Sequence, residues 1–154
     1  DGIVKIKTFE DKAPKHVKQI KELVQNGKYD GVVFHRVIDG FMAQTGDVQF
    51  GNSNSNEFDL RRAGTGGSGK NIEAEFNDMP HKKGTLSMAR AQDPNSADSQ
   101  FFICFDDTPH LDGQYTVWGE VIEGMEFVDS IKRGDPIKNG LVDDPDKIIK
   151  MWIE

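Results

Sequence analysis

The feature that most constrains the fold is a series of short strand-like segments with very few helical segments between them. Near the start, Val4 and Ile6 alternate with Lys5 and Lys7, which is the period-two pattern of a half-buried strand. A parallel sheet would need a helix between successive strands, so the pattern favours an antiparallel sheet. The other strand-like segments are VVFHRVI (32–38), GTLSMAR (84–90), QFFICF (100–105), YTVWGEVI (115–122) and KIIKMWIE (147–154).

Only two segments have helical periodicity. In residues 13–31, helical spacing places Val17, Ile20, Leu23 and Val24 on one face. A shorter helix is predicted within residues 123–134, with three residues pointing inward: Met125, Val128 and Ile131. Many strands with two helices predict a mostly antiparallel sheet that closes into a barrel, with the helices over its ends.

The composition indicates one soluble globular domain over residues 1–154, with 36% hydrophobic and 29% charged residues. A net charge of −7 argues against nonspecific binding of nucleic acid, which needs a cationic surface. No apolar run is long enough to cross a membrane. The one cysteine, Cys104, lies in an apolar segment and is predicted to be a buried, inert thiol. No signal peptide is visible, and we expect a cytoplasmic protein, or a periplasmic one if a leader precedes Asp1.

A glycine-rich stretch, GTGGSGK (64–70), partly matches a nucleotide phosphate loop. It is followed by Asn71 instead of the serine or threonine that would hold magnesium, and no apolar strand leads into it. The glycines are better explained as positions where the backbone approaches a ligand closely, or simply turns. The stretch belongs to a long loop over residues 50–71, and a loop of that length is usually functional or mobile.

The other reactive side chains give no recognisable catalytic or metal-binding pattern. The four histidines, His16, His35, His81 and His110, have no metal-ligand spacing. His35 and Arg36 are neighbours in a predicted strand, so their side chains should point to opposite faces. A Ser–His–Asp triad is compatible with the composition, but the G-x-S-x-G turn of hydrolases is absent.

The segment FHRVIDGFMAQTGD (34–47) combines a cation, aromatic rings, a thioether and an amide, and contains no nucleophile. Arg36 has two interpretations here. It is either a structural arginine that a carboxylate holds in a barrel, or part of a groove that binds an extended peptide. The second is favoured by the segment SMARAQDPNSADSQFFICF (87–105), which also mixes strand-like hydrophobic residues with polar amides.

These segments resemble the cyclophilin family of peptidyl-prolyl cis/trans isomerases, in a bacterial form. The matching stretches follow one another in the family's order over nearly the whole chain; they are FHRVIDGFMAQTGD, AGTGG, GTLSMARA, NSADSQFFICF and LDGQYTVWGEVIEGMEFVDSI, after the opening strand and helix. The resemblance implies a mainly β fold, a closed eight-stranded antiparallel β-barrel capped by two α-helices. It also implies an isomerase that accelerates rotation about X–Pro bonds and assists protein folding. The expected partners are proline-containing polypeptides; the expected enzyme is a monomer that needs no cofactor or metal.

Residue by residue, the resemblance implies the following site. The catalytic arginine of the family corresponds to Arg36, and its peptide-contacting glutamines correspond to Gln44 and Gln100. The residues of the proline pocket correspond to Phe41, Met42, Phe102 and Leu111, and those of the neighbouring groove to Gly64, Ala89, Arg90 and Ala91.

The sequence departs from the family at the rim of the site. His110 stands where much of the family has tryptophan, Tyr115 where it has histidine, and Arg90 where it has asparagine; the loop from Gly51 to Arg62 is longer than in compact members. His110 and Tyr115 are therefore expected substrate-binding residues of altered chemistry. Because the indole is missing, we expect weaker binding of cyclosporin. The alternatives to an enzyme are a proline-binding module or holdase chaperone and, more remotely, a nucleotide-binding protein through residues 64–70.

Overall fold

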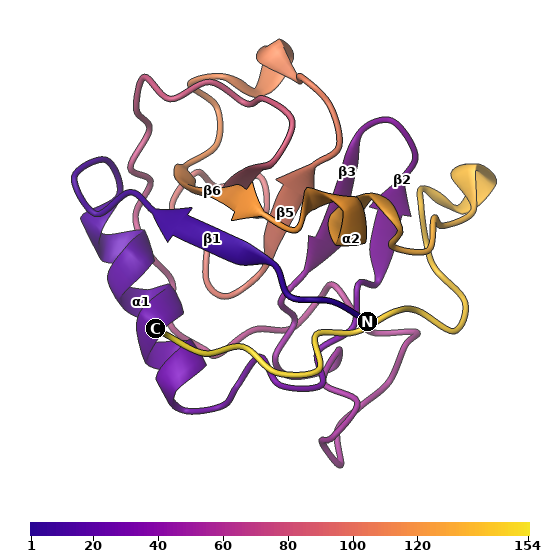
Figure 1. Ribbon diagram of the computed structural model, residues 1–154. Coiled ribbons are helices and arrows are strands. Elements are labelled where there is room, and N and C mark those ends of the chain that lie inside the picture. Colours follow the sequence, from indigo (N-terminus) through magenta and orange to yellow (C-terminus); the bar gives the residue numbers. More distant parts are fainter.

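An antiparallel sheet of six strands forms the frame of the molecule, in the order β1-β6-β4-β5-β3-β2 (Figure 1). The computed structural model describes residues 1–154. The strands are β1 (Lys5–Thr8), β2 (Arg36–Ile38), β3 (Met42–Thr45), β4 (Thr85–Met88), β5 (Phe101–Cys104) and β6 (Val117–Glu123). The α-helices are α1 (Pro14–Gln25) and α2 (Met125–Asp129).

The expected closed barrel of eight strands is wrong: the sheet has six strands and is open between its edge strands β1 and β2. The predicted strand 32–38 is regular only in its last three residues, which form β2; at its start, Val32 and Val33 make isolated bridges to Asn52 and Lys147. The predicted C-terminal strand is an extended coil (Figure 1), in which Ile149 is 61% exposed. The amide of Met151 donates to the carboxylate of Asp30, not to a neighbouring strand (2.9 Å). Alternating hydrophobicity makes a strand only where a second chain segment completes the ladder.

Alternation along the strands separates two faces of the sheet. Val37 pairs with Ala43, Ala43 with Ile103, and Ile103 with Leu86, so these four side chains lie on one face. All four belong to the main hydrophobic core, a cluster of 20 buried residues. The residues between them in sequence face the other way, and they carry the candidate site.

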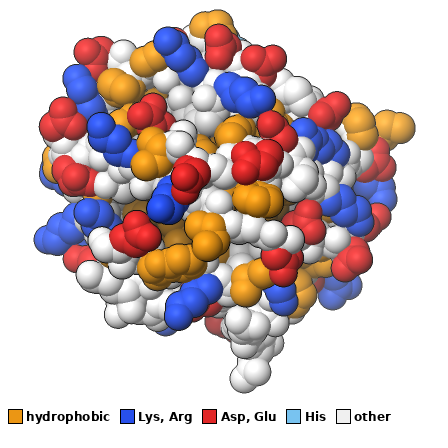
Figure 2. Space-filling view, viewed as in Figure 1, with side chains coloured by type: hydrophobic (Ala, Val, Ile, Leu, Met, Phe, Trp, Pro, Cys, Tyr) orange, Lys and Arg blue, Asp and Glu red, His pale blue; other side chains and the backbone are white.

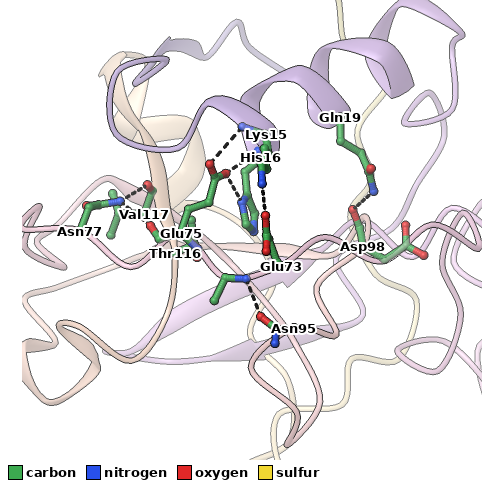
Figure 3. A network of polar contacts seen from close by, with 11 residues as sticks. Lys15, His16, Gln19, Glu73, Glu75, Asn77, Asn95, Asp98, Thr116 and Val117 are labelled. Atoms are coloured by element: carbon green, nitrogen blue, oxygen red, sulfur yellow. Dashed lines mark hydrogen bonds and ion pairs between the residues drawn. The ribbon is translucent and has the colours of Figure 1, made fainter.

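Helix α1 covers part of this core and begins at an unusual cap. Its face of Val17, Ile20, Leu23 and Val24 is buried, as predicted. Ala13 at the N-cap position offers no side-chain hydrogen bond. The free amides of the first turn are instead satisfied by a distant carboxylate, that of Glu75 (Figure 3).

Glu75 fixes the start of α1 to the segment that leads into β4. Its carboxylate accepts hydrogen bonds from the amides of Lys15 (3.2 Å) and His16 (2.8 Å), and from the ring Nδ1 of His16 (2.6 Å). Its own amide donates to the hydroxyl of Thr116 (2.9 Å) (Figure 3). The His16 ring is fully buried, and burial lowers its pKa despite the neighbouring carboxylate.

Helix α2 is shorter than predicted and ends before Ile131, but the three residues expected to point inward do so. Val128 and Ile131 are buried in the main core, and Met125 packs against that core. Helix α1 follows β1 and α2 follows β6; because these two strands are antiparallel neighbours, the helices lie at opposite ends of the pair (Figure 1).

The surface carries both signs of charge without a large patch of either on the face that Figure 2 shows. No helix has the length and apolar character required to cross a membrane. The long loop turns back on the domain: the Asp59 amide donates to the Phe50 carbonyl (3.0 Å), and the Arg62 guanidinium lies 3.9 Å from the centre of the Phe50 ring.

Candidate functional site

The side of the sheet opposite the main core carries a row of four side chains from four strands. In the strand register, Arg36 of β2 pairs with Gln44 of β3, Gln44 with Phe102 of β5, and Phe102 with Ser87 of β4. Directly paired residues point to the same face, so all four face away from the main core. We call this side the outer face. Arg36 therefore does not point into the main core.

A second, smaller hydrophobic cluster lies on the outer face. Its buried members are Met42, Phe102 and Cys104. Partly buried residues pack around them: Ile38, Phe41, Ala89, Leu111 and Tyr115. The four residues expected to form a proline pocket are all members of this cluster, which we call the outer-face cluster. Cys104 lies at its base, and burial raises the pKa of its thiol to about 11, so the thiol stays protonated at neutral pH.

Arg36 is held in place by three hydrogen bonds. Its Nε donates to the carbonyl oxygen of Asn139 (3.0 Å), and Nη2 donates to Oδ1 of the same residue (3.2 Å). Its Nη1 donates to Oε1 of Gln44 (3.1 Å). The partners are amide and carbonyl oxygens, not the carboxylate of a structural ion pair. Partial burial lowers the pKa of Arg36 from its usual value, but an arginine titrates so far above neutral pH that it stays charged.

A chain of amide hydrogen bonds continues from Arg36 to the glycine-rich loop. Gln44 Nε2 donates to Oε1 of Gln100 (3.1 Å). Gln100 Nε2 then donates to the carbonyl oxygens of Gly64 (3.0 Å) and Gly66 (2.9 Å). At this end of the chain lies a cavity of about 270 Å³ with a mainly polar lining, which includes Gln44, Gly64, Ala89, Arg90, Ala91 and Gln100. The structure thus brings the expected groove residues to one cavity, next to the outer-face cluster.

The glycine-rich loop is organised by two carboxylates of the protein. Asp47 is fully buried and accepts from the amides of Gly64 (2.8 Å) and Gly66 (2.9 Å). Asp98 accepts from the amides of Gly69 (2.9 Å) and Lys70 (3.2 Å). These amides are the groups with which a phosphate loop would bind its ligand. Because carboxylates already occupy them, the loop is a wall of the cavity and not a phosphate cradle.

The rim residues that depart from the family pattern pack on aromatic rings of the site. His110 stacks on Phe41 with 5.8 Å between ring centroids, and Tyr115 meets Phe102 edge-on at 5.9 Å. The Arg90 guanidinium lies 4.6 Å from the centre of the Tyr115 ring. Its Nη2 also donates to the carbonyl oxygen of Gln114 (2.7 Å), so Arg90 spans the border between cavity and cluster.

A Ser–His–Asp arrangement is present beneath this rim. The Nδ1 of His81 lies 2.9 Å from Oδ1 of Asp112, and its Nε2 lies 2.8 Å from the hydroxyl oxygen of Ser87. Burial lowers the pKa of His81, so the neutral ring donates to the carboxylate and accepts from the hydroxyl. Ser87 is fully buried, so no substrate can reach its hydroxyl.

The role of His81 and Asp112 is therefore structural: their contacts hold the ring of Phe102 and the turn after Thr108 in place. The His81 ring stacks on Phe102 at a centroid distance of 6.1 Å. The His81 backbone also accepts from the Thr108 amide (2.9 Å) and donates to Asp112 (2.7 Å). These contacts fix both ends of the 3₁₀ turn Pro109–Leu111, which presents His110 and Leu111 to the outer-face cluster.

Two important residues were missed by reasoning from sequence: Asn139, which holds Arg36, and Asp47, which holds the glycine-rich loop. Asn139 has a positive φ of 58°, and the Asn–Gly pair that follows Lys138 is a turn signal that could have drawn attention to it. Nothing in the sequence pairs it with Arg36, which is 103 positions away. Asp47 is the last residue of the segment 34–47, and no pattern in the sequence pairs it with the glycine-rich loop.

His35 is structural in character. It is 4% exposed, and burial lowers its pKa to about 4, so it is neutral at pH 7. Its ring packs below the glycine-rich loop, where Nε2 would be 3.1 Å from a Cβ added to Gly64. No group of three or more histidine, cysteine or acidic side chains is placed to hold a metal ion.

Comparison with known proteins identifies close relatives of the whole chain. A family model described as "Cyclophilin type peptidyl-prolyl cis-trans isomerase/CLD" matches residues 1–152. A curated protein of Brucella abortus named "Probable peptidyl-prolyl cis-trans isomerase" is 59% identical over 155 residues, covering 100% of this chain and 79% of the relative. A "Peptidyl-prolyl cis-trans isomerase" of Synechococcus elongatus is 44% identical over 138 residues, covering 88% and 86% of the two chains.

Solved structures agree with these matches. A cyclophilin-type isomerase of Cryptosporidium parvum, crystallised in the presence of the dipeptide Ala-Pro, has a TM-score of 0.81 and 29% sequence identity, covering 98% of this chain and 92% of that one. A cyclophilin from Hirschia baltica has a TM-score of 0.79 and 28% identity, covering 97% and 69% of the two chains.

Proposed function

The chain belongs to the family of cyclophilin-type peptidyl-prolyl cis-trans isomerases, and on that premise we propose that it isomerises X–Pro bonds on its outer face, with Arg36 as the catalytic donor. The protein is a peptidyl-prolyl cis-trans isomerase, as its family and relatives show. The residues that carry out the reaction are what we propose here. One observation carries it: a charged guanidinium, fixed by Asn139 and Gln44, shares a face with Phe102 and the outer-face cluster.

The reaction explains why the site needs no nucleophile. Rotation about an X–Pro bond breaks amide resonance but no covalent bond, over a barrier of roughly 18–20 kcal/mol. As the bond twists, the proline nitrogen loses conjugation and regains a lone pair. A donor next to that nitrogen can then form a hydrogen bond to the lone pair, which is not available in the planar ground state. The donor therefore stabilises the transition state selectively.

Arg36 is well suited to this role. A guanidinium has five N–H donors, and the bonds to Asn139 and Gln44 use one on each of its three nitrogens. Two N–H groups, one on each terminal nitrogen, remain for a substrate. The group is thus fixed and charged in advance, so little reorganisation is needed during the reaction.

The surrounding residues would hold the substrate while one end rotates. Phe41, Phe102 and Leu111 would grip the pyrrolidine ring and exclude water, with Met42 beneath them, which strengthens the charged hydrogen bond. Gln44 and Gln100 would bind backbone groups of the flanking chain, and Gly64 with the segment Ala89–Ala91 would line its path through the polar cavity. The contacts of His81 and Asp112 would keep Phe102 and Leu111 at a fixed position relative to Arg36.

We propose that the substrates are proline-containing polypeptides and that the activity assists their folding. The supporting observation is that a related isomerase of Cryptosporidium parvum was crystallised in the presence of Ala-Pro. We also propose that cyclosporin binds weakly, because His110, stacked on Phe41, offers less apolar surface than an indole would.

Exchange spectroscopy on a short Ala-Pro peptide tests the role of Arg36. We expect Arg36→Ala to keep its melting temperature and lose about 100- to 1,000-fold in catalysed exchange, the usual cost of one well-placed transition-state donor. The matched control is Arg61→Ala, since the Arg61 side chain is 91% exposed in the long loop and should be dispensable. Equal exchange rates for Arg36→Ala and Arg61→Ala would refute the proposed role.

A holdase that binds proline segments without relevant turnover would use the same outer face. Arg36 argues against it, because a charged donor adds nothing to the gripping of an apolar ring. Tight binding of the peptide without catalysed exchange would favour the holdase.

A further inference from the structure

The row of paired side chains on the outer face continues past the edge strand β2. Arg36 forms an isolated antiparallel bridge with Leu141. The bridge is flanked by two hydrogen bonds, from the Val142 amide to the His35 carbonyl (3.2 Å) and from the Val37 amide to the Gly140 carbonyl (2.8 Å). In this pattern the bridged residues form a non-hydrogen-bonded pair, in which the side chains lie closest and on the same face. Leu141 is thus the neighbour of Arg36 on the outer face, and it is 49% exposed.

A tight turn just before Leu141 presents a second apolar side chain. Ile137 lies in the 3₁₀ turn Pro136–Lys138 and is 94% exposed, the most exposed large hydrophobic residue of the chain. The carboxylate of Asp135 accepts from the Ile137 amide (2.9 Å), and its carbonyl accepts from the Gly140 amide (2.8 Å). Hydrophobic side chains project from the edge of the molecule where this turn lies (Figures 1 and 2).

The turn is joined firmly to the site. Asn139, which lies between the two apolar residues, accepts both hydrogen bonds that fix one side of the Arg36 guanidinium. Gly140 has a φ of +83°, and a Cβ at that position would lie 2.6 Å from a side-chain carbon of Ile38, a residue of the outer-face cluster. The backbone of the turn is therefore ordered before any ligand arrives, which lowers the entropic cost of binding there.

Exposed isoleucines are common and need no explanation when they are isolated. Ile122 and Ile149 of this chain are 59% and 61% exposed, and neither belongs to the outer-face cluster. Ile137 and Leu141 differ in their connection to the proposed catalytic arginine. Leu141 pairs with Arg36 on the side opposite its partner Gln44, which lines the polar cavity. Ile137 lies in the turn whose Asn139 holds the guanidinium. A polypeptide that places its proline at the outer-face cluster and one flank in the cavity would carry its other flank over these residues.

We propose that Ile137 and Leu141 form an apolar contact surface for a nonpolar side chain next to the proline, and so determine substrate preference. The proposal rests on the proposed function of Arg36 and adds to it a substrate class: polypeptides in which a large apolar residue flanks the proline on one side. Partial burial of the two side chains, on the order of 50 Å² of apolar area, corresponds to a preference of roughly fivefold to tenfold in kcat/KM.

The test compares three peptides of the same length: one with alanine on both sides of the proline, one with leucine before it, and one with leucine after it. For the wild-type chain we expect leucine on one of the two sides to raise kcat/KM about fivefold to tenfold over the alanine peptide. The variants Ile137→Ser and Ile137→Ser/Leu141→Ser should lower this ratio, the double variant to about one. The matched control, Ile149→Ser, removes an equally apolar exposed residue elsewhere and should leave the ratio at its wild-type value.

The ratio of kcat/KM between leucine and alanine peptides distinguishes a failure of the contact surface from a failure of the proposed isomerase function. If the wild-type ratio is about one for both leucine peptides, or if the double variant keeps the wild-type ratio, the contact surface is refuted while the isomerase activity stands. If the wild-type chain accelerates none of the peptides, the proposed function falls and this proposal falls with it. Because Ile137 is almost fully exposed, its replacement alone tests the surface without risk to the fold.

Discussion

The two faces of the same three strands, β2, β3 and β5, differ in almost every physical property. On the core face, Val37, Ala43 and Ile103 are buried and belong to the main hydrophobic core. On the outer face, Arg36 and Gln44 alternate with these residues, are half-buried, and are linked by hydrogen bonds to distant loops. One face of a sheet can therefore secure the fold while the other holds a charged group at a fixed position.

The contrast is sharpest at two adjacent residues. His35 is buried, and its pKa is lowered to about 4. Arg36 is only half-buried, so its side chain keeps some contact with solvent and stays charged. Burial selects the neutral form of the histidine because a charge in a poorly solvated site is costly. The outer face avoids that cost, because every nitrogen of the Arg36 guanidinium has an oxygen partner.

The largest effect should come from a cavity in the core face. Leu86→Ala removes a fully buried side chain of β4, and we expect it to lower the free energy of unfolding by about 3 kcal/mol. Urea denaturation would measure this. The exchange rate per folded molecule should stay close to wild type, since Leu86 faces away from Arg36. A large loss of turnover in the folded variant would show that the two faces are not independent.

Acid should destabilise the fold before it affects the charge on the outer face. The pKa of His35 is about 4 in the folded protein, below its usual value of 6.5, so the unfolded chain binds the proton more readily. Stability is therefore fully present above about pH 6.5 and is lost as the pH falls toward 4, by roughly 3 kcal/mol for this residue.

Urea denaturation of wild type and His35→Gln at pH 7.5 and 4.5 would isolate this contribution. The loss of stability between the two pH values should be smaller in the variant, because glutamine does not titrate. Parallel losses in the two proteins would assign the acid sensitivity to other groups, such as His16 and His81, whose pKa values are also lowered by burial.

A change in the middle of the outer-face row should have a smaller effect, confined to catalysis. Gln44→Ala removes the link between Arg36 and Gln100, and we expect kcat/KM to fall about tenfold, equivalent to about 1.4 kcal/mol. The melting temperature should change little, since Gln44 lies outside the main core. Gln49→Ala, which changes a glutamine just before the long loop, is the control. A loss as large as that of Arg36→Ala would mean that Gln44 contacts the substrate in the transition state.

The smallest effect should appear at the rim. His110→Trp enlarges the ring that stacks on Phe41, and we expect cyclosporin to bind severalfold more tightly, equivalent to about 1 kcal/mol. Isothermal titration calorimetry would measure the gain. The variant leaves Tyr115 unchanged; the ring of this residue contacts Phe102 and not Phe41. An affinity equal to that of wild type would indicate that Tyr115 or the longer loop shapes the rim instead.

Several features could be read from the sequence because they depend on neighbours a few residues apart. The buried face of α1 follows from the spacing of Val17, Ile20 and Leu23, and the opposite orientations of His35 and Arg36 follow from strand periodicity. The outer-face residues were found through the resemblance to a family, because Arg36, Gln44 and Phe102 share no local pattern. Their assembly into one row depends on the register of three strands.

The alternation within strands, the helix faces and the family membership can all be recognised in the sequence, since they depend on local spacing and on motifs. Three features emerge only from the folded chain: the sheet stays open with six strands, Asn139 holds Arg36 from 103 positions away, and Asp47 and Asp98 occupy the amides of the glycine-rich loop. The physical reason is the same in each case: a hydrogen bond between distant segments depends on how the whole chain packs, and no periodicity in sequence records it.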